Sequence, residues 1–287
     1  MPIASSRFAG CTAALIAVLG SVGLLSCSSD PATGMVVAIS SEAPVPEGID
    51  SFTVTVTRDG ATVFSQDYTV SGGGAKLPGT LTLHPSDADG NEIIHVKVTA
   101  SLKKDPFPVV LREATLGFVK GQQKLLRMPL RYACVGVTCA AGETCRAGAC
   151  EKDSVDASSL ADYSDDQVFP ITGKCFARNS CIEGERTELN LEQLRALFDP
   201  KTCMLAHDSA IEDVNMGFVW SYGFGTECTM VDYDGDEGWQ FESNDLKKIR
   251  FAKGLCEEVM KPNSRIVSTY IKTGCKPKPA NQPECSE

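Results

Sequence analysis

The most regular hydrophobic pattern lies in the first half of the chain. Over residues 52–57 apolar side chains alternate with threonines, so an extended segment there has one apolar face and one polar face. A turn at Asp59 and Gly60 leads into a second extended stretch, which predicts a hairpin. Seven or so short strands with turn signals between them fit within residues 34–133. This spacing predicts a β-sandwich of immunoglobulin-like type, although the Cys…Trp…Cys core of true immunoglobulin domains is missing.

The pattern from residue 168 onward is less regular. The apolar residues in this stretch have a helical spacing and predict one short helix: Leu189, Leu191, Leu194, Leu197 and Phe198. The strand-like stretches are residues 217–222, 239–241, 249–251 and 265–271. We therefore expect a mainly β protein, in which residues 168–287 form a second β-rich, disulfide-containing domain.

Two short segments separate these β regions. Residues 134–150 contain four cysteines and three glycines, and so few residues cannot bury a core without covalent staples. They predict a small disulfide module. Residues 151–167 carry six carboxylates against Lys152, which predicts a solvated acidic linker.

The amino terminus has the pattern of an export signal. Residues 13–25 are apolar but too few to cross a bilayer, which takes roughly 20 residues. The stretch ends in Leu24-Leu25-Ser26-Cys27. This motif resembles the lipobox of bacterial lipoproteins; the alternative is an ordinary secretory signal with a cysteine at its end.

The lipobox resemblance implies a specific processing and location. Residues 1–26 would be removed as a signal peptide, Cys27 would carry the lipid, and residues 27–33 would form the lipidated tether. Ser28 stands where an aspartate would favour retention in the inner membrane. The resemblance therefore implies a lipid anchor in the outer membrane, facing either the periplasm or the exterior.

Cysteine usage agrees with export. Of 13 cysteines, all except Cys11 and Cys27 lie between Cys134 and Cys285, and clustered cysteines in an exported chain indicate disulfides. Because eleven is an odd number, at least one thiol is left over or pairs between molecules. In the last domain we expect Cys175 to pair with Cys181, which is close in sequence.

The four-cysteine segment allows three disulfide pairings, and a four-thiolate zinc site is the rival interpretation. Its sequence, from Cys134 through Cys139 and Cys145 to Cys150, resembles a truncated EGF-like module. That resemblance implies the bonds Cys134–Cys145 and Cys139–Cys150. The whole layout resembles uncharacterised surface lipoproteins of the myxobacteria, a likeness of architecture that implies no activity.

An acidic motif is the sharpest candidate for a ligand site. Asp232, Asp234 and Asp236 alternate around a glycine, as at the start of an EF-hand calcium loop. Glu237 then stands where the loop needs glycine, and Ser243 where it needs glutamate. The alternatives are a different kind of calcium loop, whose cation would remove the repulsion among the three carboxylates, and a plain acidic turn.

Aromatic residues near this motif suggest a second kind of site. Trp220, Tyr222 and Trp239 lie close to the carboxylates in sequence, and flat rings beside acids commonly hold sugars. The alternative is that the tryptophans fill the core of a small domain. The sequence therefore leaves a glycan-binding surface and a hydrophobic core as the two interpretations.

Composition and motifs narrow the function. A formal net charge of −10 opposes binding to nucleic acids, and only three histidines and no catalytic motif are present. We expect a non-enzymatic, lipid-anchored envelope protein with a binding or scaffold role. It would contact the membrane through its anchor, and a glycan or an envelope protein, with calcium as the only suggested cofactor. The alternatives are a glycan-binding module in residues 168–287 and a hydrolase of unfamiliar type.

Overall fold

The computed structural model describes residues 32–43, 48–70, 73–87, 90–102, 105–169, 174–206, 213–221, 225–242 and 245–285. The predicted signal peptide, residues 1–26, and the predicted lipidation site Cys27 lie outside these residues. None of the described helices is long and apolar enough to cross a membrane. The contacts of residues 31–287 group them into one compact unit.

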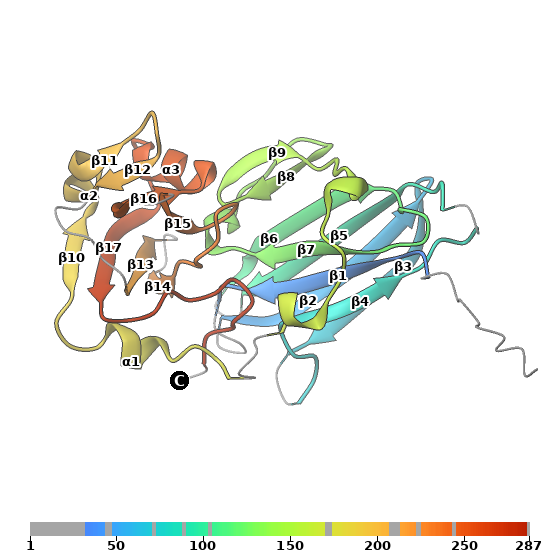
Figure 1. The fold of residues 1–287 in the computed structure, drawn as a ribbon, viewed down its shortest axis with the longest axis horizontal. Helices are drawn as coiled ribbons and strands as arrows, with labels where there is room; N and C mark the ends of the chain where they lie inside the picture. The colour runs from blue at the N-terminus through green and yellow to red at the C-terminus, as the bar shows by residue number, and fades with distance from the viewer. Residues whose placement is uncertain are drawn as a thin grey trace, which may run out of the picture. The chain divides into compact units, whose positions relative to one another are not determined.

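Two sheets form the predicted sandwich in the first half of the chain (Figure 1). Their strands are β1 (Gly34–Ser41), β2 (Ile49–Arg58), β3 (Ala61–Thr69), β4 (Gly79–Leu83), β5 (Ile94–Leu102), β6 (Asp105–Leu116) and β7 (Gln123–Leu130). One sheet has the order β4-β1-β7 and the other β3-β2-β5-β6. The strand order differs from that of immunoglobulin constant domains, and β1 pairs in parallel with β7.

The alternating pattern explains the core of this sandwich. Val54 and Val56 of β2 are buried together with Val96 and Val98 of β5, because side chains two residues apart share one face of a strand. The predicted hairpin joins β2 to β3. At its tip Asp59 and Gly60 have φ values of 50° and 77°, the left-handed conformation that a tight two-residue turn requires.

Residues 151–167 differ from the prediction, because they pack on the sandwich instead of forming a solvated linker. The N–H of Leu125 in β7 donates to the carbonyl of Ala161, and the N–H of Tyr163 donates to that of Gln123. Val168, just beyond, packs with Leu125 and with Ala38 of β1. The segment therefore pairs with the edge of β7, Tyr163 and Val168 pack against the outer side of the smaller sheet, and most of β1 is buried.

The four-cysteine segment forms a small hairpin between the two β regions. Its strands are β8 (Glu143–Arg146) and β9 (Ala149–Lys152). Cys134 is bonded to Cys145 and Cys139 to Cys150, the pairing that the EGF-like resemblance implies.

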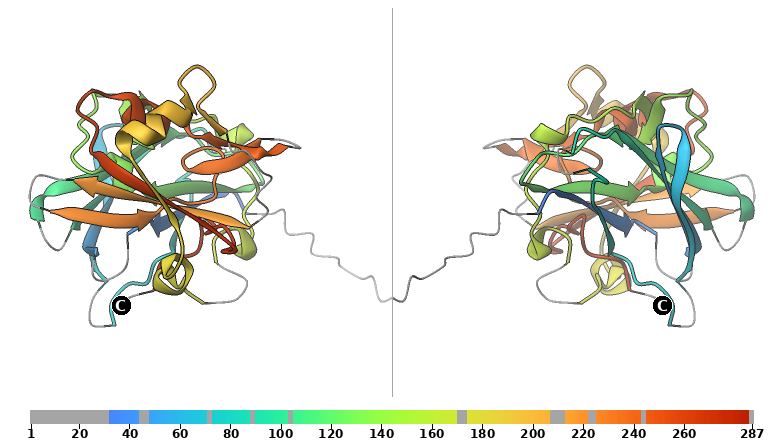
Figure 2. Two further views of the ribbon diagram at one scale, coloured as in Figure 1. Left: turned by 90° about the vertical axis from the view of Figure 1, so that its left-hand side faces the viewer. Right: turned by 90° about the vertical axis from the view of Figure 1, so that its right-hand side faces the viewer.

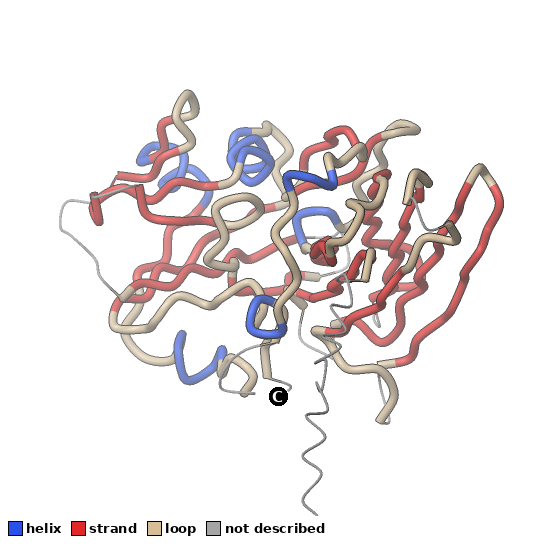
Figure 3. Tube along the Cα trace, turned by 45° about the vertical axis from the view of Figure 1, so that its right-hand side comes forward, coloured by secondary structure: helices blue, strands red, loops and turns tan. Residues whose placement is uncertain are grey.

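The described part of the remaining chain contains two four-stranded sheets and three short helices. Figure 2 shows the ribbon from two further sides. The strands are β10 (Thr187–Asn190), β11 (Phe198–Asp199), β12 (Met204–Ala206), β13 (Val214–Ser221), β14 (Thr226–Met230), β15 (Trp239–Glu242), β16 (Asp245–Phe251) and β17 (Ile266–Thr273). Their orders are β10-β17-β13-β14 and β11-β12-β16-β15. The predicted β-rich, disulfide-containing fold is confirmed, and Figure 3 shows how strands dominate it.

The helices of this region are α1 (Arg178–Ile182), α2 (Leu191–Leu197) and α3 (Lys253–Met260). The leucine spacing predicts α2, and its start is fixed by a capping box in which Asn190 and Gln193 bond to each other's backbone N–H. The sequence prediction missed α3.

The disulfides of the last region join distant segments. They are Cys175–Cys285, Cys181–Cys275 and Cys203–Cys256, and Cys228 is the unpaired cysteine among the described residues. The expected bond between Cys175 and Cys181 is therefore wrong. Cys181 lies in α1, whereas Cys175 lies beside the carboxyl-terminal segment, because the N–H of Phe176 donates to the carbonyl of Pro283.

Candidate binding cleft

A buried charge network links the first sandwich to the last region. Arg131, directly after β7, forms ion pairs with Asp232 and, at 2.8 Å, with Asp234. Lys278, which is fully buried, pairs with the other oxygen of Asp232. Glu42 lies beside Arg131 and accepts a hydrogen bond from a backbone N–H. Buried charges of this kind are tolerated only when paired.

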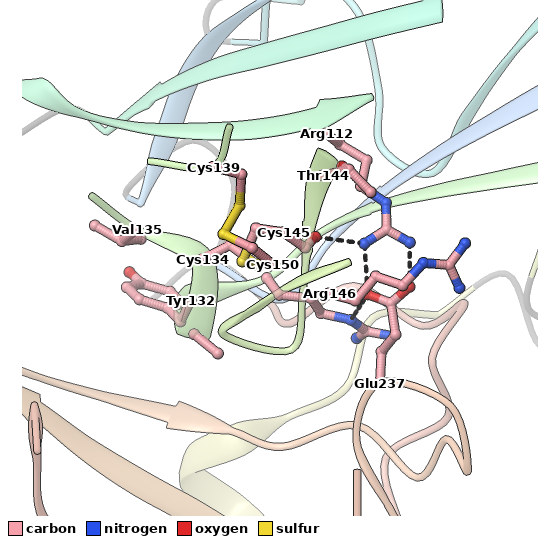
Figure 4. The surroundings of a disulfide bond; sticks show 12 residues. Arg112, Tyr132, Cys134, Val135, Cys139, Thr144, Cys145, Arg146, Cys150 and Glu237 are labelled. Atoms are coloured by element: carbon pink, nitrogen blue, oxygen red, sulfur yellow. Dashed lines mark hydrogen bonds and ion pairs between the residues drawn. A yellow bond between two sulfur atoms is a disulfide. The ribbon is translucent and has the colours of Figure 1, made fainter. Parts of the chain in front are cut away.

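A second buried pair lies in the same junction. Arg112 of β6 donates to both carboxylate oxygens of Glu237 and, at 2.6 Å, to the carbonyl of Cys145 (Figure 4). One guanidinium thus connects the sandwich, the disulfide hairpin and the loop after β14. Burial lowers the pKa of Arg112, and the charge of Glu237 opposes that shift.

A cleft of about 620 Å³ lies beside this junction. Its walls come from the β7 edge, the packed segment 155–167 and the loop 233–237. The volume falls within the range typical of ligand sites, about 300–1,000 Å³. Apolar lining comes from Leu125, Pro129 and Leu160, whereas Arg127 and Asp236 supply charge.

The charged groups at the cleft surface are available to a ligand. Arg127 is exposed, and its guanidinium has no ion-pair or hydrogen-bond partner among the described residues. The same holds for the carboxylate of Asp236, which is also exposed. Arg146 has only a distant ion pair with Glu151, at 3.9 Å. The cleft lining thus combines charges that are paired within the protein, on Arg112, Glu237 and Asp234, with charges of both signs that have no partner among the described residues.

The predicted calcium motif has protein cations as partners. Asp232 and Asp234 are paired with Arg131, and Asp232 also with Lys278, so the repulsion assumed from the sequence is already removed. Within the described ranges, no three His, Cys, Asp or Glu side chains are grouped to hold a metal ion. Asp236 donates its backbone N–H to Asp234 in a local turn and lines the cleft.

The two tryptophans predicted to stack on sugars are buried inside the protein. Trp220 and Trp239 are 1% and 0% exposed. Their indole N–H groups donate to the hydroxyl of Thr229 and the carbonyl of Val231. Tyr222, the third residue of that prediction, lies outside the described residues. The two tryptophans form core, as the alternative interpretation had it, and they offer no ring face to a sugar.

Sequence reasoning missed the aromatic residue that does line the cleft. Tyr233, between the first two aspartates of the motif, is 41% exposed and packs edge-on against Trp239. Sequence reasoning also missed Arg127, although the sequence contains a signal that could have indicated it. Arg127 interrupts the apolar stretch of β7 at an outward position, between the buried Leu126 and Met128.

Comparison of the sequence with protein-family models and with curated proteins found no match to either.

Proposed function

We propose that this protein is a lipid-anchored envelope protein without catalytic activity, which binds a partner at the outer membrane through the cleft beside β7. The observation that carries the binding role is that Arg127 and Asp236, which have no partner among the described residues, line a cleft whose other charged residues Arg112, Glu237 and Asp234 are paired within the protein. Paired side chains that are already ordered suit recognition, because little ordering is needed on binding.

The anchor and the location rest on the sequence. Leu24-Leu25-Ser26-Cys27 resembles a lipobox, and Ser28 favours the outer membrane in the sorting of such proteins. Five disulfides in the described residues support an oxidising compartment, where disulfides persist. Several acyl chains together anchor firmly, since each buried methylene contributes about 0.8 kcal/mol.

The anchor is tested by Cys27→Ala. We expect a precursor that keeps residues 1–26 and takes up no labelled palmitate, whereas Cys11→Ala, inside the signal, serves as the control and should be labelled normally. Normal maturation of the Cys27 variant to an unlabelled soluble protein would overturn the lipid anchor.

The binding role is tested in intact cells by a photo-crosslinking side chain. Benzoylphenylalanine in place of Tyr233, an exposed aromatic residue of the cleft, should give a discrete crosslinked adduct, and the same group in place of Glu192, exposed at the start of α2, should not. Absence of an adduct at 233, or equal adducts at both positions, would argue against the cleft as the binding surface.

A further inference from the structure

The hydrogen bonding of β7 shows which backbone groups face the cleft. Gly34 donates its N–H to Gln122, and Glu42 donates its N–H to the carbonyl of Leu130, so the even-numbered residues of β7 bond to β1. Backbone groups alternate in direction along a strand. The N–H and C=O of Gln123, Leu125 and Arg127 therefore point to the opposite edge.

The packed segment covers only the first part of that edge. Gln123 and Leu125 bond to Tyr163 and Ala161, and the ladder stops there. The preceding residues turn away as a 3₁₀ helix, Ala157–Ser159, in which the N–H of Ser159 donates to Asp156 instead of to β7. The cleft opens at this divergence, since Ser159 and Arg127 both line it.

The backbone of Arg127 consequently has no hydrogen-bond partner in the described part of the chain. A strand edge with free N–H and C=O groups is a template for another extended chain. Pro129 follows two residues later and has no N–H, which limits the free edge to a short stretch. A ligand that pairs here would form few backbone bonds.

We propose that the cleft binds a short extended peptide segment, which adds to the free edge of β7 by pairing with the backbone N–H and C=O of Arg127. This inference rests on the proposed binding function and names the class of ligand. The cleft supplies what such a segment needs beyond its backbone bonds. Tyr233 offers an exposed ring, and Arg127 and Asp236 offer opposite charges to side chains or to a peptide terminus.

The test uses the full chain purified in detergent and a displayed library of random hexapeptides as the probe. Selection on the wild-type protein should enrich sequences that carry both an acidic and a basic group, and their binding should weaken as salt rises. Selection is repeated on Arg127→Pro and Arg127→Ala. Both variants lack the guanidinium, but only the alanine keeps the backbone N–H.

Enriched peptides should bind Arg127→Pro at least about fivefold more weakly than Arg127→Ala, the effect of about one hydrogen bond. Proline is tolerated at a strand edge, and equal melting temperatures of the two variants would show that both fold. Failure to enrich any hexapeptide, or equal affinity for the two variants, would overturn the proposal. If both variants lose binding equally, the guanidinium of Arg127 is what the ligand needs; this result would contradict backbone pairing and would indicate a small anion as the ligand.

Hydrogen exchange provides a second reading on the unmodified protein. The amide of Arg127 should exchange freely and become protected when an enriched peptide is added, while that of Leu125, already bonded, should be protected throughout. A protected Arg127 amide in the free protein would contradict an open edge. If peptide does not protect the Arg127 amide while Cys27 is labelled normally with palmitate, the peptide site is refuted and the proposed lipid anchor is unaffected.

Discussion

Residues 34–133 contain no cysteine, whereas residues 174–285 contain seven, six of them in disulfides that span 53 to 110 positions. The first region buries continuous apolar faces, as in β2 and β5. Both regions also bury charged residues: Glu42, Arg112 and Arg131 in the first, and Asp232, Lys278 and Glu284 in the second. What distinguishes the last region is its three long-range disulfides.

The difference shows two ways of reaching a specific fold. An apolar sandwich is stabilised by burial that is roughly proportional to area, and many of its contacts are interchangeable. A region that closes long loops with disulfides depends on particular pairs of residues, each of which is costly to break. The last region should therefore be the more sensitive to single changes.

The largest loss of stability is expected when a long-range disulfide is removed. Replacing Cys203 and Cys256 by alanine opens a 53-residue separation, which the enclosing bond Cys181–Cys275 shortens only slightly, and should lower the free energy of unfolding by about 4 kcal/mol on the loop-entropy estimate. Replacing Cys134 and Cys145, which are 11 residues apart, should cost about 2.8 kcal/mol. Urea unfolding measures both values. Equal losses in the two variants would mean that loop length does not govern these bonds.

The next-largest loss of stability is expected when the buried ion pairs of Arg131 are removed. Arg131→Ala leaves Asp232 and Asp234 without their shared partner and should destabilise the protein by about 3–5 kcal/mol. Arg127→Ala, on β7 just before Arg131, removes a side chain that has no partner among the described residues and should change stability by less than about 0.5 kcal/mol. If the two variants unfold at the same urea concentration, the network does not stabilise the junction.

A smaller, pH-dependent effect is expected from Glu284. Burial raises the pKa of its carboxyl to about 7, against the opposing charge of Lys278, so the folded state holds a proton that the unfolded state releases near pH 4.5. Stability from this group is complete below pH 4.5 and is lost as pH rises to about 7, by an amount on the order of 2–3 kcal/mol.

Melting temperatures measured from pH 4.5 to 7.5 test this expectation. Glu284→Gln should flatten the decline, because an amide does not titrate. Glu257→Gln, an exposed carboxyl on α3, is the matched control and should leave the profile unchanged. An unaltered pH profile in the Glu284 variant would place the titration elsewhere.

The smallest change in melting temperature is expected on addition of calcium. Since Asp232 and Asp234 already hold Arg131 and Lys278, a cation must displace a protein partner to bind there. We expect the same melting temperature with chelator and with calcium at about 5–10 mM, which exceeds the affinity range of extracellular modules. A rise that disappears in Asp236→Ala would restore the calcium loop suggested by the sequence.

The sequence by itself determined the local elements. Alternation at positions two apart specified β2, Asp59 and Gly60 specified the turn from β2 into β3, and the leucine spacing specified α2. These features depend on neighbours along the chain, because strand and helix periods are short. The clustered cysteines of residues 134–150 also indicated a small disulfide module, whose hairpin only the structure showed.

Only the tertiary structure decided which distant residues meet. Arg131 and Asp232 are 101 positions apart, and Cys175 and Cys285 are 110 apart. No local pattern encodes such pairs, because they depend on how whole sheets pack. The same reason explains why the two tryptophans are buried in the core and why the acidic motif is paired with protein cations. Burial and ion pairing are properties of the folded surroundings, and composition alone does not supply them.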